Sequence, residues 1–210
     1  MTDVPARPAS TVVLLRPSDR RFEVLLMRRH DQVAFMGGAH VFPGGRVDDS
    51  DRADDPAMRH RLAAVRELQE EAAISLGVDA LTPFAHWVTP AGELKRFDTW
   101  FFVALVPPDQ VAVHDGTEHD DSIWVDPAEA IEMARRGEIL LPPPTWMTLR
   151  RMAEFERPED VLAWARTVDV VRIQPELRSE PGMRIVTVPG TPAAVFVLRG
   201  GRWRESTPEP

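Results

Sequence analysis

The 210-residue chain contains no cysteine, which excludes disulfide bonds and thiol chemistry. It contains a single lysine, Lys95, so that nearly all of its positive charge is arginine. Any clamp for phosphate groups must therefore be built from guanidinium groups, which can bind oxyanions in a bidentate manner. The chain also lacks an apolar run near the length that spans a bilayer.

Composition and charge narrow the class of protein further. A hydrophobic content of 43% with 28% charged residues is typical of a globular chain, and the net charge of -8 without a basic run argues against a general nucleic-acid binder. No membrane association is expected. Residues Met1–Pro5 lack a basic region followed by an apolar one, and Ser206–Pro210 do not form a peroxisomal address. We therefore expect a cytoplasmic protein.

The segment Arg66–Glu71, with the sequence RELQEE, is the most informative stretch. At about 100° per residue, Glu67, Glu70 and Glu71 fall within roughly 100° of arc on a predicted helix. The opposite side carries the apolar residues Leu62, Val65, Leu68, Ala72 and Leu76. Clustered carboxylates repel each other unless a cation lies between them, and hard oxygen ligands favour Mg²⁺ or Mn²⁺. Taken alone, the helix favours an ordinary solvated acidic face over a metal site.

The sequence before the helix indicates a catalytic motif. A short predicted strand, Ala39–Phe42, runs into Pro43-Gly44-Gly45, and a polar loop rich in Asp leads from there to the helix. This pattern resembles the Nudix hydrolases, whose signature reads Gly, five residues, Glu, seven residues, then Arg-Glu-aliphatic-any-Glu-Glu-any-Gly-aliphatic. Gly45 takes the place of the leading glycine. The second half is matched by Arg66, Glu67, Leu68, Glu70, Glu71 and Ile74.

The chain departs from that signature in the length of one segment and at two residues, Asp51 and Ala73. Gly45 and Arg66 are separated by seven more residues than the short signature has, and the extra length falls in Val47–Met58, which we interpret as a longer surface loop. Asp51 occupies the position of the first signature acid, one methylene shorter than Glu. Ala73 stands where glycine is usual, and we expect the helix to continue through it at negative φ.

The sequence outside the signature resembles the branch of the family that contains the mammalian peroxisomal coenzyme A diphosphatase and its bacterial relatives. The similarity covers most of residues 10 to 165. It rests on FMGGAHVFPGG (35–45), WVTP (87–90), RFDTWFF (96–102), WVDPAEA (124–130) and PPPT (142–145). Coenzyme A-cleaving members also tend to carry a basic residue upstream of a glycine that precedes Phe-Pro-Gly-Gly by three residues. Gly38 and Phe42 satisfy that spacing, and Ala34 stands at the basic position.

The resemblance implies a set of metal ligands. Glu70 and Glu71 are expected to be the principal ligands of Mg²⁺ or Mn²⁺, and Glu67 a direct or water-mediated one. Arg66 is expected to orient a glutamate by a salt bridge. Glu118 is the candidate for a further ligand or general base, with an ordinary exposed loop acid as the alternative.

The resemblance also implies hydrolysis of a nucleoside diphosphate linked to another moiety. Gly44 and Gly45 are expected beside the bound ligand. The leading hypothesis is cleavage of coenzyme A or acyl-coenzyme A to 3',5'-ADP and a phosphopantetheine. The alternatives are NADH, ADP-ribose or a nucleotide sugar as substrate, or a Nudix-fold sensor that binds a nucleotide without cleaving it. A homodimer is a family-level expectation.

The fold class expected is α/β with mixed α+β character, an α/β/α sandwich around a mixed sheet with extra C-terminal helices and short strands. Residues 8–167 would form the Nudix domain and 168–210 an extension of short strands and a frayed tail. Strands are expected at 10–15, 22–28, 39–42, 81–88, 96–106 and 122–125, and helices at 127–136, 145–155 and 158–166. None of the six histidines forms a ligand-spaced pair with another.

Overall fold

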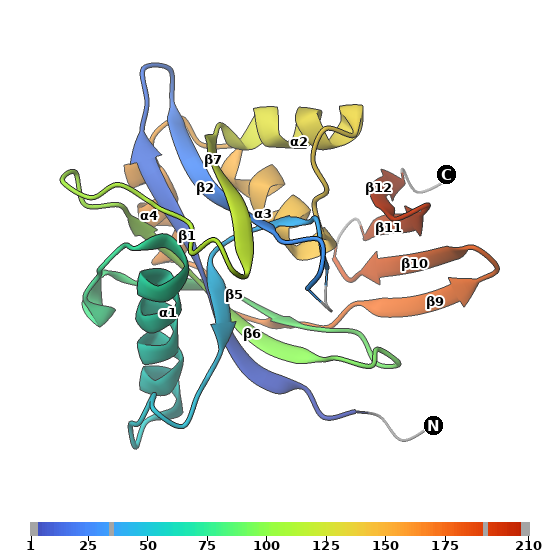
Figure 1. Cartoon of the computed structure of the whole chain (residues 1–210), viewed down its shortest axis with the longest axis horizontal. Coiled ribbons are helices and arrows are strands. Elements are labelled where there is room, and N and C mark those ends of the chain that lie inside the picture. Colours follow the sequence, from blue (N-terminus) through green and yellow to red (C-terminus); the bar gives the residue numbers. More distant parts are fainter. Residues whose placement is uncertain (1–3, 34–35, 191–192, 207–210) are drawn as a thin grey trace.

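A computed structural model of the chain describes residues 4–33, 36–190 and 193–206. A mixed sheet forms the centre, with helix α1 on one face and helices α2, α3 and α4 on the other, and a second, smaller sheet follows at the C-terminal end (Figure 1). The expected mixed α/β sandwich is confirmed. The helices are α1 (Pro56–Ala72), α2 (Pro127–Arg136), α3 (Pro143–Met152) and α4 (Pro158–Ala165), with a short 3-10 helix η1 (Val78–Ala80).

Eight strands form the central sheet, in the order β3-β2-β1-β6-β5-β8, with β4 paired to β1 and β7 paired to β2. The pairs β1–β6 and β5–β8 are parallel, and the others are antiparallel. The strands are β1 (Arg7–Pro17), β2 (Phe22–Arg29), β3 (His40–Val41), β4 (Gly44–Arg46), β5 (Thr82–Val88), β6 (Phe97–Leu105), β7 (His119–Val125) and β8 (Arg172–Ile173).

Strand β1 is apolar on both faces because both are covered. Val12 and Leu14 pack in the core beneath α1, whereas Val13 and Leu15 belong to the core on the side of α2, α3 and α4. Alternate residues of a strand point to opposite faces, so a strand buried on both sides is a continuous apolar run. This explains why the central strands were predictable to within a few residues.

Helix α1 begins and ends with defined caps. The Asp55 side chain accepts a hydrogen bond from the Ala57 N–H at 3.0 Å, and Pro56 occupies the first turn. The helix ends at Ala73, which has a left-handed φ of 56°. The expectation of a negative φ at Ala73 is therefore wrong. The reason is the burial of Ile74: its N–H bonds back to the Leu68 carbonyl, and this C-terminal turn requires a left-handed residue at position 73.

The C-terminal part of the chain packs on the rest of the molecule. Strands β9 (Glu176–Glu180), β10 (Met183–Val188), β11 (Ala194–Arg199) and β12 (Arg202–Ser206) form an antiparallel meander in the order β12-β11-β10-β9. Phe196 lies edge-on to Trp146 of α3 with ring centroids 6.0 Å apart. Short strands were expected somewhere in 168–210, and the apolar segments at 183–188 and 194–199 form two of them, whereas only Arg172 and Ile173 form a strand in the apolar segment before them. The charged strands β9 and β12 carried no apolar signal.

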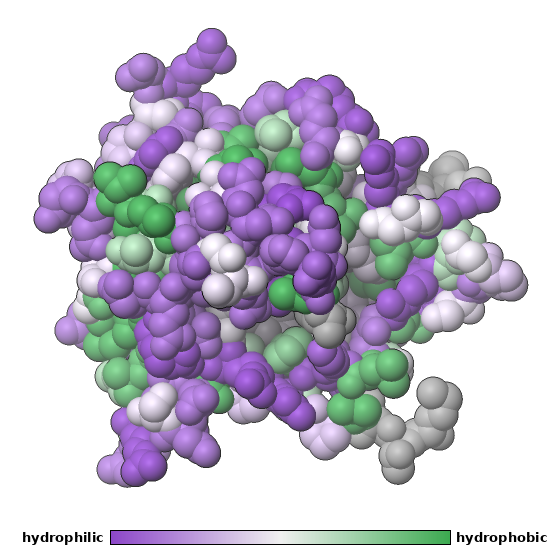
Figure 2. Space-filling view, viewed as in Figure 1, coloured by the Kyte–Doolittle hydropathy of each residue, from purple (hydrophilic) through white to green (hydrophobic). Residues whose placement is uncertain are grey.

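The surface of the viewed face is mostly hydrophilic, with separate apolar groups rather than one continuous band (Figure 2). Within the described ranges, no helix combines the length and the apolar character required to cross a bilayer.

Candidate active site

Helix α1 and strand β4 bring two glutamates against two glycines. The Gly44 N–H donates a hydrogen bond to Glu71 Oε2 at 2.7 Å. A Cβ atom placed on Gly45 would lie 2.4 Å from the carboxylate carbon of Glu67, so only glycine leaves space for that carboxylate. Gly44 and Gly45, expected beside the ligand, thus position Glu71 and Glu67 directly.

Arg66 lies at the centre of an ion-pair network. Its Nη1 donates to Glu67 Oε1 and to Glu70 Oε2, both at 2.9 Å. Its Nε and Nη2 bind the two carboxylate oxygens of Asp51 at 3.1 and 3.0 Å, and this bidentate pairing is the largest contribution that raises the pKa of Arg66. Arg66 therefore forms ion pairs with both Glu67 and Glu70. Asp51, almost fully buried, holds Arg66 instead of facing the cleft, and it anchors the lengthened loop through its bond from the Asp48 N–H.

Glu118 approaches from the loop before β7. Arg29 Nη2 donates to Glu118 Oε1 at 2.6 Å. Asp115 fixes the loop, because its carboxylate accepts the backbone N–H groups of Thr117, Glu118 and His119. The Glu118 carboxylate is held toward the same cleft as Glu67 and Glu71.

His119 is a buried residue of the site that sequence reasoning missed. Its Nδ1 lies 3.7 Å from Glu71 Oε1 and 3.4 Å from Asp115 Oδ1, and neither ring nitrogen has a hydrogen-bond partner among the described residues. Burial and the nearby Arg29 guanidinium lower the pKa of His119, which favours the neutral ring. Spacing along the sequence could not find it, because its neighbour Glu71 comes from a distant helix.

Glu67, Glu71, Glu118 and Arg29 line one cleft of about 680 Å³. Its walls combine acidic, basic and apolar residues from α1, β1, β4, β6 and the loop before β7. The lining includes Glu67, Glu71, Glu118, Arg29, Arg46, Lys95, Gly44, Gly45, Thr11, Phe42, Phe97 and Thr99. Glu70 is not part of this lining; its side chain is 57% exposed and paired with Arg66. The structure thus brings Glu67, Glu71 and Glu118 together and leaves Glu70 at the solvent side of Arg66.

The chemistry of the donor set fits a divalent cation. Burial, together with the negative charges of Glu67 and Glu118, raises the pKa of Glu71 to about 9. A buried carboxylate that faces two others is stabilised in its charged form by a cation. Carboxylate oxygens are the ligands of Mg²⁺ and Mn²⁺. In the described part of the chain, no three carboxylate or imidazole groups converge closely enough to form a ready-made metal site.

Comparison with known proteins decides the family. The NUDIX domain profile matches residues 5–142. The chain belongs to the Nudix hydrolase superfamily. The "putative nudix hydrolase 7" of Caenorhabditis elegans is 28% identical over 186 residues, which cover 71% of this chain and 61% of that protein. The chain therefore spans about three fifths of the length of this relative.

A further relative belongs to the branch suggested by the sequence. The human acyl-coenzyme A diphosphatase NUDT19 is 25% identical over 252 residues, covering 74% of this chain and 67% of that protein. Among solved structures, a NUDIX hydrolase from Alicyclobacillus acidocaldarius shares the fold, with a TM-score of 0.71 and 21% identity over 80% of this chain and 99% of that chain. Family membership and relatives named as hydrolases agree with the expectation of a pyrophosphohydrolase. Ala34, the residue at the basic position of the coenzyme A element, lies outside the described residues.

Proposed function

We propose that this Nudix protein is a divalent-cation-dependent diphosphatase that hydrolyses coenzyme A or acyl-coenzyme A. The observation that carries the proposal is the cleft that Glu67, Glu71 and Glu118 line together with Arg29. The similarity to a human protein named acyl-coenzyme A diphosphatase supports the substrate class.

In this proposal, Glu67, Glu70 and Glu71 hold Mg²⁺ or Mn²⁺, with Glu118 as a further ligand or the general base. Glu67 and Glu70 bind the same nitrogen of Arg66, so their carboxylates already converge on one positive charge. When bound, the cation lowers the pKa of a water molecule and neutralises charge on the diphosphate oxygens.

The side chains of the cleft contribute binding, orientation and proton transfer. Arg29, Arg46 and Lys95 line the cleft and attract the diphosphate anion. In the role of base, Glu118 accepts the proton of the attacking water at a carboxylate oxygen. Arg66 acts as a positioning residue, because its bonds to Asp51 fix the side chain that holds Glu67. The reaction releases 3',5'-ADP and 4'-phosphopantetheine or its acyl derivative.

The test is a mass-spectrometric screen of coenzyme A, acyl-coenzyme A, NADH, ADP-ribose and nucleotide sugars with Mg²⁺ or Mn²⁺. We expect release of 3',5'-ADP from coenzyme A compounds, and no release in excess chelator. If only another compound is cleaved, coenzyme A is rejected as the substrate, whereas the proposed hydrolysis of a diphosphate bond is kept. Tight binding without turnover of any compound would instead favour the nucleotide sensor.

Substitution of single glutamates by glutamine tests which carboxylates contribute to catalysis. Glu67→Gln and Glu71→Gln should each lower kcat by at least about 10²-fold, since each removes a charged group from the cleft. Glu132→Gln, on an exposed face of α2 paired with Arg135, is the matched control and should leave kcat unchanged. Full activity of Glu70→Gln would remove Glu70 from the ligand set, and full activity of Glu71→Gln would contradict the proposed site.

A further inference from the structure

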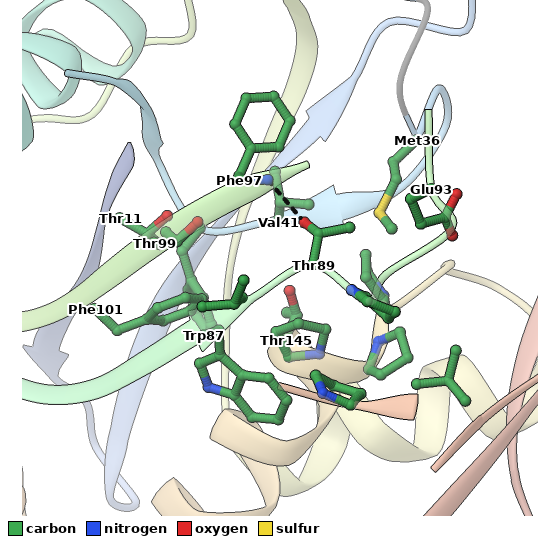
Figure 3. Close-up of a pocket in the computed structure, with 18 of the residues that line it drawn as sticks. Thr11, Met36, Val41, Trp87, Thr89, Glu93, Phe97, Thr99, Phe101 and Thr145 are labelled. Carbon is green, nitrogen blue, oxygen red and sulfur yellow. Dashed lines mark hydrogen bonds between the residues drawn. The ribbon is translucent and has the colours of Figure 1, made fainter. Parts of the chain in front are cut away.

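A second cavity of about 180 Å³ adjoins the acidic cleft. Trp87 and Phe101 of the central sheet form one wall, Pro143 at the start of α3 another, and Val186 and Trp203 of the C-terminal sheet a third. Figure 3 shows Trp87, Phe101, Phe97 and Thr145 arranged around this space. Its walls are mostly carbon, in contrast to the charged cleft beside it.

The cleft and the cavity form one continuous site on the same face of the sheet. Thr11, Phe42 and Thr99 line both. Directly paired residues of a sheet share a face, and Ala9 of the cleft pairs with Thr99, which pairs with Trp87 of the cavity. Two strand spacings, about 10 Å, therefore separate the row beside the acidic cleft from the cavity wall.

Two polar side chains at the rim of the cavity, Thr89 and Glu93, already have partners. Thr89 Oγ1 accepts the Phe97 N–H at 3.0 Å, as the dashed line in Figure 3 marks, and the Glu93 carboxylate pairs with Arg184. A nucleobase carries donors and acceptors on its edge, and burying them without partners is costly. An alkyl group has no such cost, so the cavity suits a hydrocarbon.

The C-terminal sheet contributes Val186 and Trp203, which line the cavity but not the acidic cleft. The Arg184–Glu93 ion pair ties β10 to the loop between β5 and β6. Val186 is buried in the same core as Trp146 and Phe196. Val186 and Trp203 therefore form an end wall that limits the length of a bound chain.

We propose that this cavity holds the acyl chain of a coenzyme A thioester while the diphosphate lies in the acidic cleft; this rests on the proposed function. The pantetheine arm has about thirteen chain atoms, the equivalent of four extended residues, and so reaches about 14 Å from the diphosphate. That reach spans the two strand spacings between cleft and cavity. An apolar cavity of roughly 150 Å³ accommodates benzene, so 180 Å³ holds an acyl chain of about six to eight carbons.

The expected signature is a dependence of kcat/KM on chain length. Each methylene that enters an apolar site should raise kcat/KM by about fourfold. The increase should continue from acetyl to about hexanoyl or octanoyl and then stop, because Val186 and Trp203 close the cavity. Palmitoyl-coenzyme A should be a poorer substrate than octanoyl-coenzyme A.

The experiment measures kcat/KM for free coenzyme A and for the acetyl, butanoyl, hexanoyl, octanoyl, dodecanoyl and palmitoyl thioesters. Trp203→Ala removes part of the end wall and should move the optimum to longer chains by at least four carbons. Val186→Phe fills the cavity and should abolish the preference for hexanoyl over acetyl. A thermal unfolding curve of each variant serves to check that the variant is folded.

The matched control is Trp124→Ala on β7, a partly buried tryptophan of the opposite core that lies beneath Arg16 and lines neither cavity. It should leave the chain-length profile unchanged. Cleavage of all thioesters at equal kcat/KM, or an optimum that Trp203→Ala does not move, would overturn the assignment of the cavity alone. Absence of cleavage of every coenzyme A compound, with turnover of another diphosphate, would overturn the proposed substrate and this inference with it.

Discussion

Gly45 offers a way to separate activity from folding. A methyl group added at this position would lie 2.4 Å from the Glu67 carboxylate carbon and 2.4 and 2.5 Å from its oxygens. Van der Waals contact requires about 3.4 Å or more, so the carboxylate of Gly45→Ala must move by about 1 Å. A displacement of that size in a catalytic group costs on the order of 10²-fold in rate.

The fold should tolerate the same change. Gly45 does not have a left-handed φ, so alanine fits its backbone, and the atoms that the methyl group meets are the flexible end of a side chain. Loss of the contact with Arg66 and the gain from a less flexible unfolded chain should nearly cancel, leaving the free energy of unfolding within about 1 kcal/mol of the wild type.

The assay compares kcat on the best substrate of the screen with the midpoint of thermal unfolding. Gly77→Ala is the matched control, because Gly77 has a φ of -76° and no atom within 4 Å of an added methyl group. We expect the control to keep full activity and Gly45→Ala to lose about 10²-fold at a similar midpoint. Retention of more than a third of wild-type kcat in Gly45→Ala would refute this reading of the glycine.

Three further predictions concern neighbouring features. Burial, with the nearby Arg28 charge, lowers the pKa of His40 from 6.5 to about 4, so the unfolded chain takes up a proton first as the pH falls. Above pH 6.5, where His40 is neutral in both states, the free energy of unfolding keeps its full value, and it should decrease by about 3 kcal/mol as the pH falls to 4. Urea titrations should show a smaller decrease in His40→Gln. Ala73→Gly should raise the free energy of unfolding by about 1 kcal/mol, because Ala73 has a left-handed φ, whereas the same change at the helical Ala72 should lower it; equal effects would contradict the cap. Arg66→Lys should lower kcat by at least about tenfold with a small change in KM, since lysine cannot make the forked contacts; an unchanged kcat would remove Arg66 as a positioning residue.

The positions of the acidic residues on α1 were predictable from the sequence. The degree to which each side chain is buried was only partly predictable. Glu67, Glu70 and Glu71 on one arc of a helix indicated a site only in combination with the glycine-containing sequence before the helix. On the helical wheel, Glu71 lies about 40° from Glu67 toward the buried Ala64, and Glu70 lies about 60° away on the other side. This difference in direction explains why Glu71 is buried and Glu70 is exposed. The burial of Glu71 also depends on β4, which packs against α1 on the side of Glu71.

The remaining parts of the site depend on contacts between distant segments. Gly45 approaches Glu67 only because β4 pairs with β1 beside α1, and no local pattern encodes that distance. His119 meets Glu71 across 48 positions of sequence. The left-handed Ala73 follows from burial of Ile74, which wins over the intrinsic cost of that conformation at a non-glycine residue.

The most direct test of the proposed cation site is binding of Mn²⁺ itself, measured by electron paramagnetic resonance on the wild type and on Glu71→Gln, with Glu132→Gln as the control. The account predicts saturable binding in the wild type and the control, weakened by at least about tenfold in Glu71→Gln. Equal affinity in all three proteins would contradict the assignment of the cleft at Glu67 and Glu71 as the cation site.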